Sequence, residues 1–96
     1  MGLRDTYDFD SLVNEAERMV LGELEIQMAR AGDICTCQDC VLDMAAYALN
    51  NVKPSYRVSL MGSVYARSAQ QSEYAQEIKR SVSEAIKKVM ENPSHD

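Results

Sequence analysis

The stretch from residue 35 to residue 56 reads CTCQDCVLDMAAYALNNVKPSY and contains all three cysteines of the chain. Thiolates that are two and three residues apart can converge on one soft metal ion, and zinc is the usual occupant of such sites. A disulfide framework instead needs an even number of cysteines spread along the chain. The cluster therefore predicts a metal site formed by Cys35, Cys37 and Cys40.

The residues after the cluster predict a helix that begins near Asp39. Apolar side chains recur at the i, i+1, i+4, i+7, i+8 spacing of a buried helical face. Asn50-Asn51 and then Pro54 end this pattern, because proline disfavours helical backbone in the residue before it. The predicted buried face consists of Val41, Leu42, Ala45, Ala48, Leu49 and Val52.

A longer helix, from about Phe9 to Ala31, is predicted before the cluster. Asp10 or Ser11 would cap its start, and Gly32 would end it, because glycine adopts the left-handed conformation without a Cβ clash. Its apolar residues cover a wider arc than a monomer's surface helix usually shows, so we expect one side to face another subunit. The main stripe contains Leu12, Val13, Ala16, Met19, Val20, Leu24 and Met28, and the residues outside it are Leu21 and Ile26.

Between residues 54 and 69 the helical pattern weakens. Tyr56, Val58 and Leu60 alternate as in a short strand, and Met61-Gly62 would turn the chain. This alternation fits either a short β-hairpin or an ordered loop.

The last predicted helix has a cap at Ser68 or Ser72 and stops at Asn92-Pro93. The fold class that follows is all-α: a single small helical domain over residues 1–96, with a short irregular or hairpin insertion. The apolar stripe of the last helix contains Tyr74, Ile78, Val82, Ala85, Ile86 and Val89.

Composition excludes some classes of function. The net charge of −5 speaks against binding of nucleic-acid polymers, which needs a broad basic face. No apolar run approaches the ~20 residues that span a bilayer, and the first residues lack the apolar core of a signal peptide. We therefore expect a cytoplasmic protein without a membrane partner.

The order of motifs resembles the late competence protein ComFB family. In that family a CxC-x2-C cluster leads into a helix reading D-x-x-A-x-A/S-L-N and then an x-P-x-Y turn. The matching residues here are Cys35 to Cys40, Asp43, Ala48-Leu49-Asn50 and Pro54-Ser55-Tyr56. The match covers about residues 35–56, and its four elements at fixed spacing make it specific.

The resemblance implies a symmetric homodimer with a cysteine-bound zinc. Family members that bind zinc are expected to supply a fourth cysteine near the C-terminus, which this chain lacks. His95, its only histidine, stands in about that place and is the candidate fourth ligand. Some members lack the cysteines and are described as cyclic-dinucleotide receptors, so the shared function need not reside in the metal.

The cluster also admits other interpretations. Asp39 or Asp43 would complete the zinc tetrahedron in place of His95, which near a chain end is often solvated and frayed. Alternatively, Cys37 and Cys40 form a CxxC at a helix start, where the helix dipole lowers the pKa of a thiol and favours redox chemistry. The remaining alternative is three reduced cysteines without a special role.

Two Arg–Tyr pairs form a second candidate site: Tyr56 with Arg57, and Tyr65 with Arg67. Arginine can donate two hydrogen bonds to a phosphate or a guanine edge, and tyrosine can stack on a base. The pairs would hold a cyclic dinucleotide, cyclic di-GMP or cyclic di-AMP. Otherwise the tyrosines pack against the helices and the arginines are solvated.

No nucleophile–base pair, paired carboxylates or glycine-rich phosphate loop is recognisable, which disfavours an enzyme. The sequence and the resemblance together predict a non-enzymatic dimeric regulator that binds a cyclic dinucleotide and carries a structural zinc. The alternatives are an adaptor that recruits protein partners without a small ligand, and a thiol redox sensor.

Overall fold

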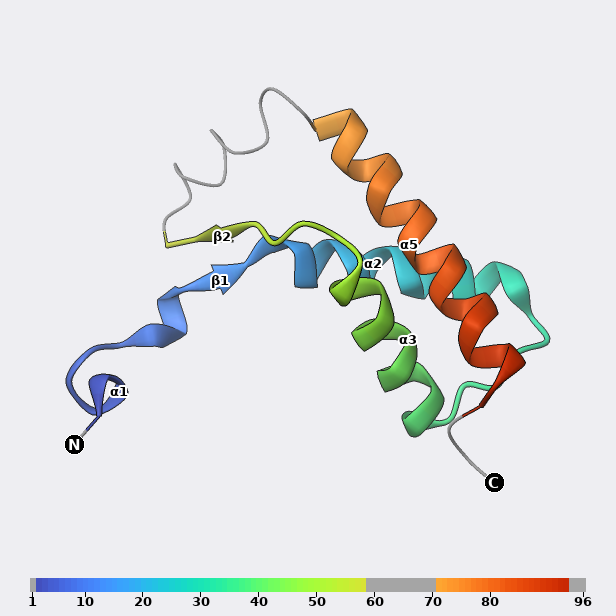
Figure 1. The fold of residues 1–96 in the computed structure, drawn as a ribbon, viewed down its shortest axis with the longest axis horizontal. Coiled ribbons are helices and arrows are strands. Elements are labelled where there is room, and N and C mark those ends of the chain that lie inside the picture. Colours follow the sequence, from blue (N-terminus) through green and yellow to red (C-terminus); the bar gives the residue numbers. More distant parts are fainter. Residues whose placement is uncertain (1, 59–70, 94–96) are drawn as a thin grey trace.

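The computed structural model describes residues 2–58 and 71–93. This part of the chain is mostly helical and contains one small sheet, as expected for a small helical domain (Figure 1). Its elements are α1 (Leu3–Thr6), a 3-10 turn η1 (Phe9–Ser11), β1 (Val13–Asn14), α2 (Glu15–Ala31), α3 (Gln38–Asn50), β2 (Tyr56–Arg57) and α5 (Gln71–Glu91).

The predicted start of the first long helix is wrong by about one and a half turns. Helix α2 begins at Glu15, and the side chain of Asn14 caps it by accepting a hydrogen bond from the backbone N–H of Ala16 at 3.1 Å. The preceding residues form a 3-10 turn and a short strand, and Leu12 is 44% exposed. Periodicity misled the prediction because Leu12 lies four residues before Ala16 and extends the stripe into a segment that is not helical. Gly32 ends the helix with a φ of 74°, as predicted.

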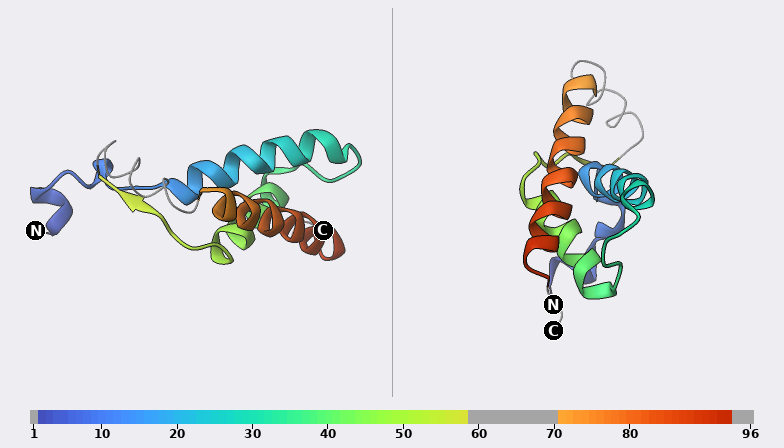
Figure 2. Two further views of the ribbon diagram at one scale, coloured as in Figure 1. Left: turned by 90° about the horizontal axis from the view of Figure 1, so that it is seen from above. Right: turned by 90° about the vertical axis from the view of Figure 1, so that its right-hand side faces the viewer.

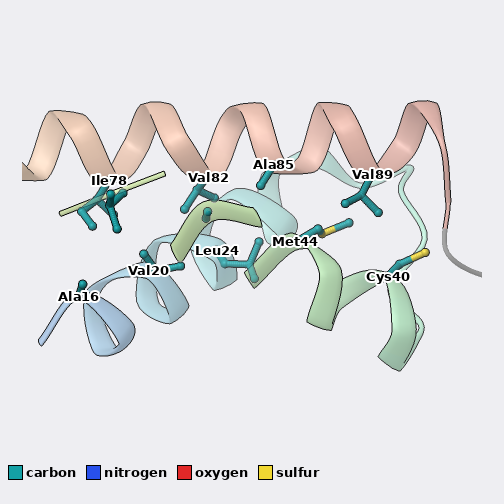
Figure 3. Packing of buried hydrophobic residues seen from close by; sticks show 11 residues of the cluster. Ala16, Val20, Leu24, Cys40, Met44, Ile78, Val82, Ala85 and Val89 are labelled. Carbon is teal, nitrogen blue, oxygen red and sulfur yellow. The ribbon is translucent and has the colours of Figure 1, made fainter. Parts of the chain in front are cut away.

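The core lies between α5 on one side and α2 and α3 on the other (Figure 3). Each helix contributes residues that are mostly four positions apart, which is the spacing that keeps side chains on one face. The buried apolar residues are Ala16, Val20 and Leu24 from α2, Cys40, Met44 and Ala48 from α3, Val52, and Ile78, Val82, Ala85 and Val89 from α5.

Helix α3 turns a different face to the core from the one predicted. Leu42, assigned to the buried face, is 57% exposed, whereas Met44 is fully buried. The helix packs against both α2 and α5, and the face that meets both neighbours is centred on Met44. The apolar pattern of this short helix did not show which side is buried most deeply, because Val41, Ala45 and Leu49 are half-buried beside the face that contains Met44.

Helix α5 carries the predicted stripe, with Tyr74 and Ile86 packed at its margin. It begins at Gln71, so Ser72 lies inside the first turn and is not the cap. The alternative cap, Ser68, lies outside the described residues. The helix ends at Glu91, as the Asn92-Pro93 signal predicted.

The predicted strand at Tyr56 is present as β2, and its partner among the described residues is distant in sequence. Strand β2 pairs with β1 in antiparallel register, with Val13 opposite Arg57 and Asn14 opposite Tyr56. The second half of the predicted hairpin lies outside the described residues. The pairing brings the N-terminal end of α2 next to the segment that carries Tyr56 and Arg57.

The N-terminal segment extends away from the three long helices (Figure 2). No residue of α1 is buried, and Leu3 and Tyr7 are 63% and 62% exposed. On α2, the two apolar residues outside the predicted stripe, Leu21 and Ile26, are also exposed. These surfaces are compatible with the predicted homodimer, which stays a prediction.

Among the helices of the described residues, none combines the length and the apolar character that crossing a membrane requires.

Candidate functional site

The three cysteines converge at the start of α3. Their Sγ atoms all lie within 4.8 Å of one another, close enough for one ion to contact all three after small side-chain adjustments. The convergence follows from local backbone geometry. Cys37 caps the helix and Cys40 lies one turn later, so both side chains point to the same end of α3.

Cys37 accepts two hydrogen bonds from the first turn of α3, one through its sulfur and one through its carbonyl oxygen. Its Sγ accepts a hydrogen bond from the backbone N–H of Cys40 at 3.4 Å, and its carbonyl oxygen accepts one from Val41 at 3.0 Å. An N–H donor and the positive end of a helix dipole both favour a negatively charged sulfur. The site is therefore suited to thiolate ligands.

The cluster is partly enclosed by the core. Cys40 is fully buried, and Cys35 and Cys37 are half-buried against the same residues. Cys40 lies at the same end of the buried cluster as Val89 of α5 (Figure 3). The same helix supplies Met90, whose Sδ accepts a hydrogen bond from the backbone N–H of Cys35 at 3.5 Å. The end of α5 thus packs against the backbone at the start of the cysteine motif.

Neither of the two predicted carboxylate ligands belongs to the cysteine cluster. Asp39 and Asp43 are exposed, and neither carboxylate belongs to the group of converging ligand atoms. His95 lies outside the described residues. Three thiols at this spacing fit a thiophilic ion, and four sulfur or nitrogen donors would make a closed tetrahedral site.

The Tyr56–Arg57 segment is anchored to the start of α2. The side chain of Asn14 accepts a hydrogen bond from the backbone N–H of Ser55 at 2.8 Å, in addition to the one from Ala16. The backbone N–H of Glu15 donates to the carbonyl oxygen of Ser55 at 2.7 Å. Asn14 therefore serves both as helix cap and as the junction between the two strands.

Glu15 is a buried carboxylate that bridges two arginines. Its Oε2 accepts a hydrogen bond from Nε of Arg57 at 2.7 Å, and its Oε1 accepts one from Nε of Arg18 at 2.9 Å. The Arg57 side chain is only 20% exposed, whereas that of Arg18 is 60% exposed. Arg57 is thus not a solvated arginine. Its Nε edge faces Glu15, which holds the guanidinium in one orientation.

This arrangement sets the charge of Glu15. The hydrogen bond from Arg57 lowers the pKa of Glu15 below its usual 4.5; burial opposes this shift, and Arg18 adds to it. A lowered folded-state pKa contributes stability that is present above the unfolded value of 4.5 and is lost as the pH falls through the folded value.

We expect Glu15→Gln to destabilise the protein at neutral pH, since it leaves both arginines without their charged partner. The difference in the free energy of unfolding between parent and variant should shrink as the pH falls below 4.5, because Glu15 then takes up a proton in the unfolded chain and, at lower pH, in the folded protein. Urea unfolding of both proteins between neutral pH and about pH 3 measures this. A difference that is the same at every pH would contradict the assignment.

A second set of contacts fixes the turn before β2 to α5. The Tyr74 hydroxyl donates a hydrogen bond to the carbonyl oxygen of Lys53 at 2.5 Å, and the Lys53 N–H donates to Glu77 at 2.9 Å. Ser81 donates to the carbonyl oxygen of Asn51 at 3.2 Å. Burial raises the pKa of Tyr74, and the Glu77 and Glu15 carboxylates raise it further, so the phenol remains a neutral donor.

The structure thus describes half of the predicted ligand site. Tyr56 is 63% exposed, so its ring is accessible for stacking, and Arg57 lies beside it on β2. Tyr65 and Arg67 lie outside the described residues. Sequence reasoning missed Glu15 and Asn14, and no local signal distinguishes them from ordinary first-turn and capping residues.

Comparisons with known proteins agree with the motif order. A family model described as "Late competence development protein ComFB" matches residues 13–93. A solved structure of the late competence protein ComFB from Bacillus subtilis is 30% identical, with a TM-score of 0.70. The similarity covers 86% of this chain and 92% of that one. A comparison with curated proteins found no significant match.

Proposed function

This chain belongs to the late competence development protein ComFB family, and we propose that it acts as a cytoplasmic, non-enzymatic regulator of that type. In this proposal two copies form a symmetric homodimer, each copy carries a structural zinc, and the dimer binds a cyclic dinucleotide. The observation that carries the proposal is the convergence of three cysteine sulfurs within 4.8 Å at the start of α3.

Zinc would be held by Cys35, Cys37 and Cys40, with His95 as the fourth ligand. Four protein ligands make a closed site, which stabilises a fold and leaves no open position for a reacting group. The site would join the loop after α2 to the first turn of α3 and to the end of α5. This connection is most valuable in a domain whose core is as small as this one.

The dinucleotide would bind at β2. Arg57 supports this assignment because Glu15 accepts a hydrogen bond from its Nε and fixes the plane of the guanidinium, whose terminal nitrogens would contact a phosphate or a guanine edge. Tyr56 offers an exposed ring for stacking. Tyr65 and Arg67 would complete the site in each copy. A twofold-symmetric ligand on a twofold axis would meet the same groups on each side.

One observation favours the adaptor alternative. The N-terminal segment exposes Leu3 and Tyr7, and Val58 after β2 is 68% exposed, which is apolar area that a protein partner could cover. Redox sensing is less well supported, because a disulfide between Cys37 and Cys40 would use only two of the three sulfurs that converge.

Calorimetric titration with cyclic di-GMP and cyclic di-AMP tests the proposed function. We expect saturable binding of one of the two with one ligand per dimer. Light scattering on the same sample measures the mass, and a monomeric protein would overturn the symmetric site. Absence of heat with both ligands would favour the adaptor.

A further inference from the structure

The outer side of α2 carries apolar side chains that the described residues leave exposed. Leu21 and Ile26 are 45% and 48% exposed, and Ala29 is exposed further along the same helix. At about 100° per residue, the strip that these residues form is centred opposite Val20 and Leu24, which pack into the core. Helix α2 lies on the outside of the three long helices (Figure 2). Its outer strip is therefore available to another molecule.

Gly22 lies in the middle of this strip, and the fold itself gives no reason for a glycine there. The residue is exposed in the interior of α2, where glycine destabilises a helix relative to alanine. A Cβ atom at this position would meet no side chain and no other segment of the chain within 4 Å. The missing side chain does, however, let the backbone of a second helix approach closely.

Two opposite charges flank Gly22 on the same strip. Arg18 and Glu25 are both exposed, Arg18 by 60%, and they lie about 10 Å apart along the helix axis. If a second α2 crosses the first in antiparallel orientation, with a twofold axis between Leu21 and Gly22, Arg18 of each copy lies beside Glu25 of the partner subunit. A parallel arrangement would instead oppose like charges.

We propose that α2 forms the homodimer interface by packing antiparallel on α2 of a second copy, with Leu21 and Gly22 at the twofold axis. This inference rests on the homodimer of the proposed function and names the surface that forms it. The pattern favours a second copy over an unrelated protein because the charges of the strip complement each other under a twofold rotation. Close contact at Gly22 would bury the exposed area of Leu21 and Ile26.

This interface connects dimerisation to the proposed ligand site. Glu15, which accepts a hydrogen bond from Arg57, lies at the start of α2 and about 10 Å along the helix from the proposed axis. In the antiparallel pair the two copies of Arg57 lie on either side of that axis. A twofold-symmetric ligand that spans the axis would then meet one Arg57 from each copy.

Charge reversal tests the pairing. Glu25→Arg should raise the dimer dissociation constant, measured by sedimentation over a range of protein concentrations, by at least about tenfold, because it opposes like charges twice. Reversal is the informative change, since deletion of an exposed ion pair alone alters association little. Glu84→Arg, the same change at an exposed position of α5, is the matched control and should dimerise like the parent. Adding Arg18→Glu to Glu25→Arg should restore association.

Gly22→Gln tests the close approach independently of charge. The side chain has room in the single chain and glutamine favours helix more than glycine does, so the variant should keep its helical circular dichroism. It should nevertheless weaken the dimer by at least about tenfold, because a side chain at the crossing separates the two backbones. If Gly22→Gln and Glu25→Arg both dimerise like the parent, this interface is wrong and the homodimer stands. A parent that is monomeric at every concentration overturns the homodimer itself.

Discussion

Arg57→Ala is expected to weaken cyclic di-GMP binding by about two to four decades. A hydrogen bond to a charged group is worth about 1.5–3 kcal/mol, and in a symmetric dimer each variant removes two copies of the contact. Twice that free energy corresponds to the stated loss, at about 1.4 kcal/mol per decade. Calorimetric titration of parent and variant measures it, with cyclic di-AMP as the second ligand.

Arg57→Ala also removes a partner of the buried Glu15, so a loss of affinity has to be separated from a loss of folding. Arg18→Ala is the matched control, because Arg18 donates to the same carboxylate but is 60% exposed and takes no part in the proposed ligand site. It should keep the parental affinity. Arg57→Lys should keep the charge beside Glu15 and still bind weakly, since lysine lacks the fork of two parallel donors. If Arg57→Ala and Arg67→Ala both bind cyclic di-GMP like the parent, the assignment is wrong.

Cys37→Ser is expected to lower the melting temperature by at least about 10 °C, since 1 kcal/mol shifts it by about 4–8 °C in a domain of this size. The variant removes a zinc ligand and replaces the Sγ that accepts the N–H of Cys40. Structural zinc sites contribute folding free energy directly, so part of the domain's stability should disappear with the ion. Thermal unfolding followed by circular dichroism measures the change.

Two comparisons identify the metal as the cause. Thr36→Ser, an exposed substitution inside the same motif, should melt like the parent, and a zinc chelator should bring the parent close to Cys37→Ser. Since zinc would be a scaffold and would not contact the ligand, dinucleotide affinity measured well below both melting temperatures should change little. A chelator that leaves the parent's melting temperature unaltered argues that the cysteines serve only as small core residues.

The candidate metal site was predictable from sequence because it is local. Cys37 and Cys40 are one helical turn apart, and a cap followed by a first turn brings them together whatever the rest of the chain does. The same reasoning explains why the apolar stripe and the C-terminal end of α5 were predicted correctly. Its regular stripe and its Asn92-Pro93 end depend on nearest neighbours along one helix.

The surroundings of the proposed ligand site, in contrast, could not be predicted from sequence. Tyr56 and Arg57 could be singled out as residue types, but the partner strand β1 and the carboxylate of Glu15 are more than forty residues away. No periodicity links them, because short strands carry almost no pattern and a first-turn glutamate is common in helices.

Residue order alone therefore determines the three long helices, their C-terminal ends and the cysteine cluster, all of which arise from hydrogen bonds and spacing within a few residues. Tertiary packing decides which face of α3 is buried, where β2 pairs, that Arg57 is held by Glu15, and that Met90 contacts the backbone of Cys35. These outcomes depend on how helices cross and on which distant groups satisfy each other's charge and hydrogen bonds. Such contacts depend on the packing of all the core segments together and not on the sequence of any single segment.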